Sequence, residues 1–93
     1  MQLFSGQTSD GQSSSIKLGS FGQRRYDIFT FYAWGTFGGG TVKLQISLDE
    51  SKWFDIPNAS LTAEGVLNIQ FRAPYVRADL SGSSGANLNA ELR

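Results

Sequence analysis

Residues 38–50, which read GGGTVKLQISLDE, decide the fold of this chain. A run of glycines leads directly into alternating apolar and polar residues, and the stretch ends in the acidic pair Asp49-Glu50. A period of two is typical of a β-strand with one buried face, and a slip of one residue would expose the whole apolar set. The pattern predicts a strand over residues 41–48 whose inward side chains are Val42, Leu44, Ile46 and Leu48 and whose outward ones are Lys43, Gln45 and Ser47.

Similar short stretches recur along the chain, separated by turn-forming residues at a spacing typical of β-sandwiches and barrels. We therefore expect a single domain over residues 1–93, an all-β, antiparallel, jelly-roll-like β-sandwich of about eight short strands. The strands are predicted at residues 3–7, 15–18, 25–34, 41–48, 53–56, 66–71, 75–81 and 87–92. Residues 8–15 are predicted to form a loop, and the sequence also allows residues 1–15 to be an extended or mobile N-terminal arm.

The strand predicted over residues 25–34 carries large side chains on both faces. One face presents Ile28, Tyr32 and Trp34, and the other presents Phe29, Phe31 and Ala33. A strand with one face in water would alternate apolar with polar residues. We expect both faces to be covered, either because the strand is central in the fold or because a partner covers one of them.

Several local features complete the predicted architecture. Pro57 should end the return strand that begins at Trp53, because proline cannot donate a hydrogen bond within a sheet. Residues 60–64 are predicted to form one helical turn, and Trp53 to lie in the core or at its edge. The last strands alternate clearly, so the following residues should point inward: Leu67, Ile69, Phe71, Val76, Ala78, Leu80, Leu88, Ala90 and Leu92.

The composition narrows the classes of function. The chain has no cysteine and no histidine, which removes disulfides, thiolate metal sites and the usual general base at neutral pH. The acidic residues of the turn, Asp49, Glu50 and Asp55, lack the spacing of a calcium loop and are predicted to be solvated. Serines are common, but none lies in a nucleophile motif. We expect no enzymatic activity, no cofactor and no metal.

Charge and size point to protein partners. The net charge is zero, with 8 basic and 8 acidic residues, which argues against a binder of nucleic acid. No segment has the length of a membrane span or the pattern of a secretory signal, so we expect no membrane partner and synthesis in a reducing cytoplasm. A chain of 93 residues without disulfides buries a small core, so we expect a homo-oligomer or docking on a larger partner.

Two groups of residues are candidates for a protein interface. Trp34 and Phe37 flank a glycine-rich loop containing Gly38, Gly39 and Gly40, and they can serve as interface anchors, as core residues or as stacking surfaces for sugar rings. The glycines allow either a tight bend or the close approach of another backbone. The basic pair Arg24-Arg25 is either a solvated strand entrance or an anchor for an acidic surface.

The segment from Trp34 to Ser47, WGTFGGGTVKLQIS, followed by an acidic turn and Trp53, resembles small β-sandwich virion proteins of tailed bacteriophages. The later stretch YVRADLSG over residues 75–82, with a polar Ser/Gly loop after it, belongs to the same pattern. The resemblance covers residues 26–92 and carries over no active site. It implies a structural role on the virion.

The resemblance implies a capsid decoration (cement) protein that binds neighbouring major capsid subunits on the phage head, as a dimer or trimer. A neck or tail component is the alternative within the same class. A carbohydrate-binding module is the alternative from a different class, and it would require an open row of aromatic side chains.

Overall fold

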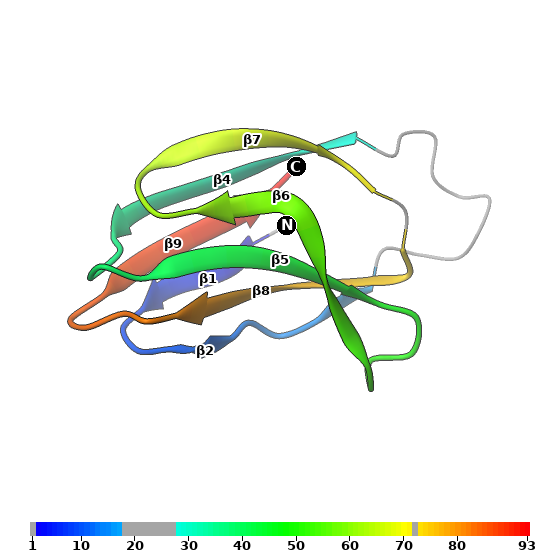
Figure 1. The fold of residues 1–93 in the computed structure, drawn as a ribbon, viewed down its shortest axis with the longest axis horizontal. Helices are drawn as coiled ribbons and strands as arrows, with labels where there is room; N and C mark the ends of the chain where they lie inside the picture. The colour runs from blue at the N-terminus through cyan, green and yellow to red at the C-terminus, as the bar shows by residue number, and fades with distance from the viewer. Residues whose placement is uncertain (1, 18–27, 72) are drawn as a thin grey trace.

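The computed structural model describes residues 2–17, 28–71 and 73–93, which contain nine strands and no helix (Figure 1). The strands are β1 (Gln2–Gln7), β2 (Gly11–Gln12), β3 (Ile16–Lys17), β4 (Ile28–Thr36), β5 (Thr41–Ser47), β6 (Trp53–Leu61), β7 (Gly65–Gln70), β8 (Tyr75–Ser81) and β9 (Asn87–Leu92).

The strands form two antiparallel sheets packed face to face. Sheet A has the order β1-β9-β4-β7, and sheet B has the order β2-β8-β5-β6, with β3 also paired to β8. Since β2 and β3 pair with successive parts of β8, they act as one interrupted strand, and the arrangement is then that of an eight-stranded jelly roll. The predicted antiparallel β-sandwich is therefore confirmed.

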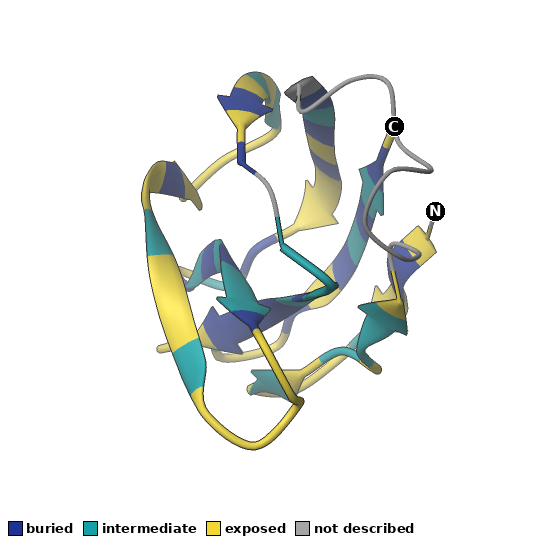
Figure 2. Ribbon diagram, turned by 90° about the vertical axis from the view of Figure 1, so that its right-hand side faces the viewer, coloured by how far each residue is buried: buried dark blue, intermediate teal, exposed yellow. Residues whose placement is uncertain are grey.

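The core lies between the two sheets, and buried residues alternate with half-buried or exposed ones most clearly along β5 and β9 (Figure 2). The predicted inward positions of β8 and β9 are all buried, and those of β7 are buried or half-buried. The largest fully buried side chains are Phe31, Leu44, Leu80, Leu88, Leu92, Val42 and Val76. A period of two predicts these faces because each strand has one side against the opposite sheet.

The predicted end of the strand β5 is wrong by one residue. Leu48 is 80% exposed, whereas Ser47 is only 3% exposed. The Ser47 hydroxyl oxygen accepts hydrogen bonds from the amides of Asp49, at 3.2 Å, and Glu50, at 2.9 Å. These bonds start the turn at Ser47, so Leu48 leaves the strand before it can follow the alternation inward.

The strand β6 does not stop at Pro57, as predicted, but continues to Leu61. It forms the edge of sheet B, and its register against β5 shifts between Lys43 and Gln45. Asn58 adopts a φ of 62° within this irregular part of the strand. Proline is tolerated at sheet edges and bulges because no ladder hydrogen bond is lost there. The helical turn predicted over residues 60–64 is also wrong, since this segment holds the end of β6 and a turn.

The segment considered as an N-terminal arm supplies strands to both sheets. β1 pairs with β9 and buries Leu3 and Phe4, while β2 pairs with β8 inside the predicted loop 8–15. The Asp10 carboxylate accepts hydrogen bonds from the amides of Gly82, at 3.0 Å, and Ser83, at 2.8 Å. The connection between β1 and β2 is thus tied to the loop between β8 and β9.

Candidate binding face

The outer face of sheet A carries two exposed aromatic side chains at its centre. β4 lies between β9 and β7, and its alternate residues Phe29, Phe31 and Ala33, which the sequence places on one strand face, point into the core. Tyr32 and Trp34 point the other way and remain 37% and 41% exposed. The described residues therefore leave these two side chains of β4 partly exposed, so within this part of the chain the predicted coverage of both faces is incomplete.

An open hollow lies beside these aromatic side chains. It is lined by Tyr32, Ala33, Trp34, Glu64, Gly65 and Val66. Tyr32 pairs with Val66 across the β4–β7 ladder, and Ala33 pairs with Gly65. Because the Ala33 side chain is buried and Gly65 has none, the backbone forms the floor of the hollow, and the remaining four side chains surround it. We call Tyr32, Trp34, Glu64 and Val66 the aromatic face.

Glu64 is held in position at the hollow by a backbone contact. One oxygen of its carboxylate, Oε1, accepts a hydrogen bond from the amide of Gly35 at 3.1 Å. Gly35 has a φ of 107°, and a Cβ at this position would lie 2.4 Å from the carbonyl oxygen of Asn87 on β9. The glycine therefore allows β4 and β9 to approach closely, at the point where its amide positions Glu64.

Amide side chains border the aromatic face on both sides. On β7, the Asn68 Oδ1 atom accepts a hydrogen bond from the Thr30 hydroxyl at 3.0 Å. On β9, Asn89 pairs with Trp34, and its Oδ1 atom accepts a hydrogen bond from the Gly6 amide at 3.1 Å. In both residues Oδ1 accepts a hydrogen bond within the chain, and the Nδ2 donor has no hydrogen-bond partner among the described residues, so it is available to a ligand.

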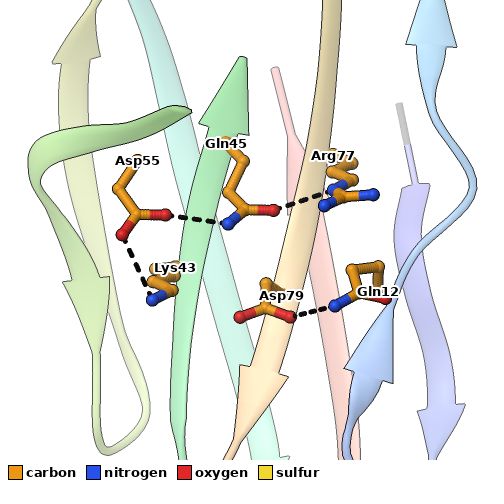
Figure 3. A network of polar contacts seen from close by, with 6 residues as sticks. All are labelled: Gln12, Lys43, Gln45, Asp55, Arg77 and Asp79. Atoms are coloured by element: carbon orange, nitrogen blue, oxygen red, sulfur yellow. Dashed lines mark hydrogen bonds and ion pairs between the residues drawn. The ribbon is translucent and has the colours of Figure 1, made fainter. Parts of the chain in front are cut away.

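The outer face of sheet B differs, because its side chains bind one another (Figure 3). Asp55 accepts hydrogen bonds from Lys43 at 3.2 Å and from Gln45 at 2.8 Å. Gln45 in turn accepts from the Arg77 Nε atom at 2.8 Å. Gln12 donates to Asp79 at 2.8 Å. These contacts use part of the hydrogen-bonding capacity of this face and join its side chains into a network.

Trp53 belongs to the same outer face and lies outside the core, contrary to prediction. Its side chain is half-buried, and the Arg77 guanidinium carbon lies 4.3 Å from the ring centroid. The cation thus covers the indole ring in a cation–π contact. The Trp53 Nε1 atom donates to the carbonyl oxygen of Glu50 at 3.3 Å, which joins the ring to the preceding turn.

A second exposed apolar group lies on the hairpin between β5 and β6. Leu48 is 80% exposed and Phe54 is 56% exposed, and Phe54 pairs with the half-buried Ile46. Figure 1 shows this hairpin extending beyond the rest of the sandwich at the lower right. We call Leu48 and Phe54 the hairpin tip.

The candidate interface residues predicted from sequence do not form one surface. Trp34 lies on the aromatic face, but Phe37 is 7% exposed and belongs to the core. Gly38 and Gly40 approach the loop between β8 and β9 closely, and Gly39 is exposed. The close approach allowed by Gly38 and Gly40 is therefore made by this same chain. Arg24 and Arg25 lie outside the described residues.

Sequence reasoning missed three members of the aromatic face, although the sequence carries a signal for two of them. For Tyr32 the signal is its position two residues before Trp34, which puts both side chains on the same face of the strand. Val66 precedes the inward residue Leu67, so the alternation alone turns its side chain outward. Glu64 has no such signal, because its position depends on the Gly35 amide of a different strand.

The carboxylates with shifted pKa values all favour the charged form. Hydrogen bonds lower the pKa of Asp10, mainly that from the Ser83 hydroxyl, and that of Asp49, mainly that from the Ser51 amide. The pKa of Asp55 is lowered by the hydrogen bonds from Gln45 and then Lys43. A general acid would need a raised pKa. Within the described ranges, no group of three or more acidic side chains has the arrangement of a metal site.

Comparisons with known proteins return no relative. No protein family, curated protein or solved structure matches this chain. Among residues 2–17, 28–71 and 73–93, no helix is long and apolar enough to cross a membrane. The surfaces described above are therefore the features of the structure from which a function can be inferred.

Proposed function

We propose that this chain is a non-enzymatic structural protein of a tailed-phage virion, a capsid decoration protein that binds neighbouring capsid subunits. The hairpin tip is the observation that carries the proposal. The sequence pattern from Trp34 to Ser47, with its resemblance to small phage virion proteins, names the partner class.

The hairpin tip has the chemistry of a protein contact. Leu48 and Phe54 expose apolar surface, and neither side chain offers a hydrogen-bonding group. Burying such a side chain fully is worth about 1.5–3 kcal/mol, so an apolar pocket on another protein is the matching partner. Because the tip extends beyond the sandwich, it can enter a depression between two subunits while the sheets stay outside.

The rest of the molecule suits a protein that is stabilised by its particle. A small sandwich without disulfides has a limited core, and binding of the folded form to a shell stabilises it by mass action. Oligomerisation on the particle would follow the symmetry of the shell.

The proposal is tested on purified virions of the phage that encodes the chain. Mass spectrometry should find the protein in the particles, and labelling should place it on the head. Absence from the virion contradicts the whole proposal, and labelling of the neck or tail contradicts the decoration role.

A rebinding experiment tests the surface. Purified protein with Leu48→Asp and Phe54→Asp should fail to sediment with particles from which the native protein has been removed. Val66→Asp is the matched control, since Val66 is 57% exposed but lies on the aromatic face. Equal loss of binding in the control would show that the hairpin tip is not the contact.

A further inference from the structure

We infer that the aromatic face of sheet A binds a neutral oligosaccharide, with Tyr32 and Trp34 as stacking surfaces and Glu64 as a hydrogen-bond acceptor. This inference goes beyond the proposed function, because the hairpin tip takes no part in it. The two surfaces give the chain one contact for a protein and another for a glycan.

The aromatic side chains have the placement that a saccharide needs. A sugar ring has an apolar C–H surface edged by hydroxyl groups, which matches an aromatic ring that is partly in water. Tyr32 and Trp34 are two residues apart on one strand, so their Cα atoms are separated by about 7 Å. A short saccharide lying along β4 can therefore contact both rings.

The scaffold beneath the rings is rigid. β4 is hydrogen-bonded on both sides, to β9 from Phe31 to Thr36 and to β7 from Ile28 to Ala33. The inward residues of the same strand, among them Phe31 and Ala33, are packed in the core. A site on a fixed strand loses little freedom when a ligand binds, which favours affinity for a small ligand.

The polar groups around the rings complement hydroxyl groups, which both donate and accept hydrogen bonds. The Glu64 Oε1 atom is held by the Gly35 amide, while Oε2 has no partner among the described residues and can accept from a hydroxyl. Asn68 and Asn89 use their Oδ1 atoms within the chain and present Nδ2 donors at the two borders. One acceptor and two donors thus lie around the stacking surface.

The charges favour a neutral saccharide over an anionic one. The carboxylate of Glu64 lines the hollow itself, and Glu91, which pairs with Tyr32, forms an ion pair with Arg93 at 3.3 Å. No cation of the described residues lines the hollow, so a sulfated or carboxylated sugar would meet a like charge there.

The same carboxylate argues against a dry protein interface. A protein lid would remove Glu64 from water, and a buried carboxylate is costly unless a cation or several donors accompany it. A saccharide satisfies the carboxylate with its own hydroxyl groups and leaves its edges wet. The observations therefore favour a glycan as the occupant.

The probe is an array of immobilised neutral oligosaccharides, namely glucans, mannans, galactans and xylans, with sulfated and sialylated sugars beside them. The purified full chain should bind at least one neutral saccharide, and it should bind no anionic saccharide more tightly than that one. The best neutral saccharide is then titrated in solution against the protein.

Variants locate the binding site. Trp34→Ala should weaken binding by about tenfold or more, as loss of a central aromatic contact does. Tyr32→Ala and Glu64→Gln should each weaken it by a smaller factor. Phe54→Ala, which removes an exposed aromatic ring from the hairpin tip, is the matched control and should bind like the parent. The thermal unfolding midpoint of every variant checks that it is folded.

A spectroscopic readout makes the assignment independent of stability. The chain has two tryptophans, so Trp53→Phe leaves Trp34 as the single indole emitter. Saccharide binding should shift its emission, and Trp34→Phe should retain part of the affinity.

Three results would overturn the inference. In the first, the folded parent chain binds no neutral saccharide. In the second, Trp34→Ala binds the saccharide as tightly as the parent. In the third, Trp34→Ala weakens attachment to virions and leaves saccharide binding unchanged. The first two results do not depend on whether the chain binds a capsid, so this inference can fail while the proposed function stands, and the reverse.

Discussion

The amide of Ser84 donates a hydrogen bond to the carbonyl oxygen of Gly38 at 2.9 Å, which joins the loop after β4 to the loop after β8. Gly38 has a φ of 61°, and a Cβ built on it would lie 2.5 Å from the carbonyl oxygen of Ser84. Gly39 has a φ of 76°, but nothing lies within 4 Å of its Cβ position. An alanine at either position would have a left-handed backbone, but only an alanine at position 38 would also clash with a neighbouring backbone atom. Comparing the two substitutions therefore measures the cost of the clash.

Gly38→Ala should destabilise the protein more than Gly39→Ala. Both substitutions place an alanine in the left-handed region, at about 1–2 kcal/mol each, but only the first also meets the backbone of Ser84. We expect the free energy of unfolding to fall by about 2–4 kcal/mol for Gly38→Ala. Urea denaturation of both variants checks this, and equal losses would show that the loop contact contributes little.

Alanine substitutions of Leu44 and Leu48 test whether β5 ends at Ser47. Leu44 is fully buried, so Leu44→Ala should lower the free energy of unfolding by about 2–5 kcal/mol. Leu48 is 80% exposed, so Leu48→Ala should change it by about 0.5 kcal/mol or less. Chemical denaturation of the isolated chain is the measurement. A large loss of unfolding free energy for Leu48→Ala would indicate that Leu48 points inward, as the alternation predicts.

Ser47→Ala should destabilise the hairpin between β5 and β6. The substitution removes the acceptor of the Asp49 and Glu50 amides at a position that is 3% exposed. Loss of an acceptor from such a site costs about 1–3 kcal/mol. Ser60→Ala on the exposed side of β6 is the control and should be close to neutral. Thermal unfolding distinguishes the two, and similar midpoints would contradict the role given to the Ser47 hydroxyl.

Acid should weaken the tie between Asp10 and the loop after β8. The hydrogen bond from the Ser83 hydroxyl is the main cause that lowers the pKa of Asp10 in the folded chain. The unfolded chain, with an ordinary pKa of about 3.9, therefore binds a proton first as the pH falls. The stabilisation is complete above this pH and is lost as the pH falls through the lower folded value.

Asp10→Asn removes that titration while it keeps one acceptor oxygen. The difference in urea midpoint between the parent and this variant should be largest near neutral pH and should shrink below about pH 4. Part of the acid sensitivity should remain in the variant, because hydrogen bonds also lower the pKa values of Asp49 and Asp55. A difference that stays constant down to pH 2 would contradict the assignment.

Alternation predicted the regular strands, which pack one face against the opposite sheet. Val76, Ala78 and Leu80 on β8, like the inward residues of β9, occupy the positions that the period of two assigns to them. The reason is local, since neighbouring side chains of a strand point to opposite faces whatever the rest of the fold does.

The errors arose where a turn hydrogen bond, or the place of a strand in its sheet, decides the local structure. Ser47 ends β5 through hydrogen bonds of the following turn, and Pro57 stays within β6 because that strand happens to be an edge. Phe37 and Trp34 have similar sequence surroundings, yet one is in the core and the other on the surface. The positions of Pro57, Phe37 and Trp34 depend on which sheet each strand joins and on the order of the strands. The pattern of a single sequence carries little of that information.

The place of β9 within sheet A has a consequence for biosynthesis. β9 is the last strand in the sequence, yet it lies between β1 and β4, and Gln2 pairs with Glu91 across almost the whole chain. On the ribosome, the β5–β6 hairpin can form as soon as its residues emerge, because its contacts are local. Sheet A can be completed only after residue 92 has left the exit tunnel, and until then the nascent chain carries the aromatic strand β4 with one edge unpaired.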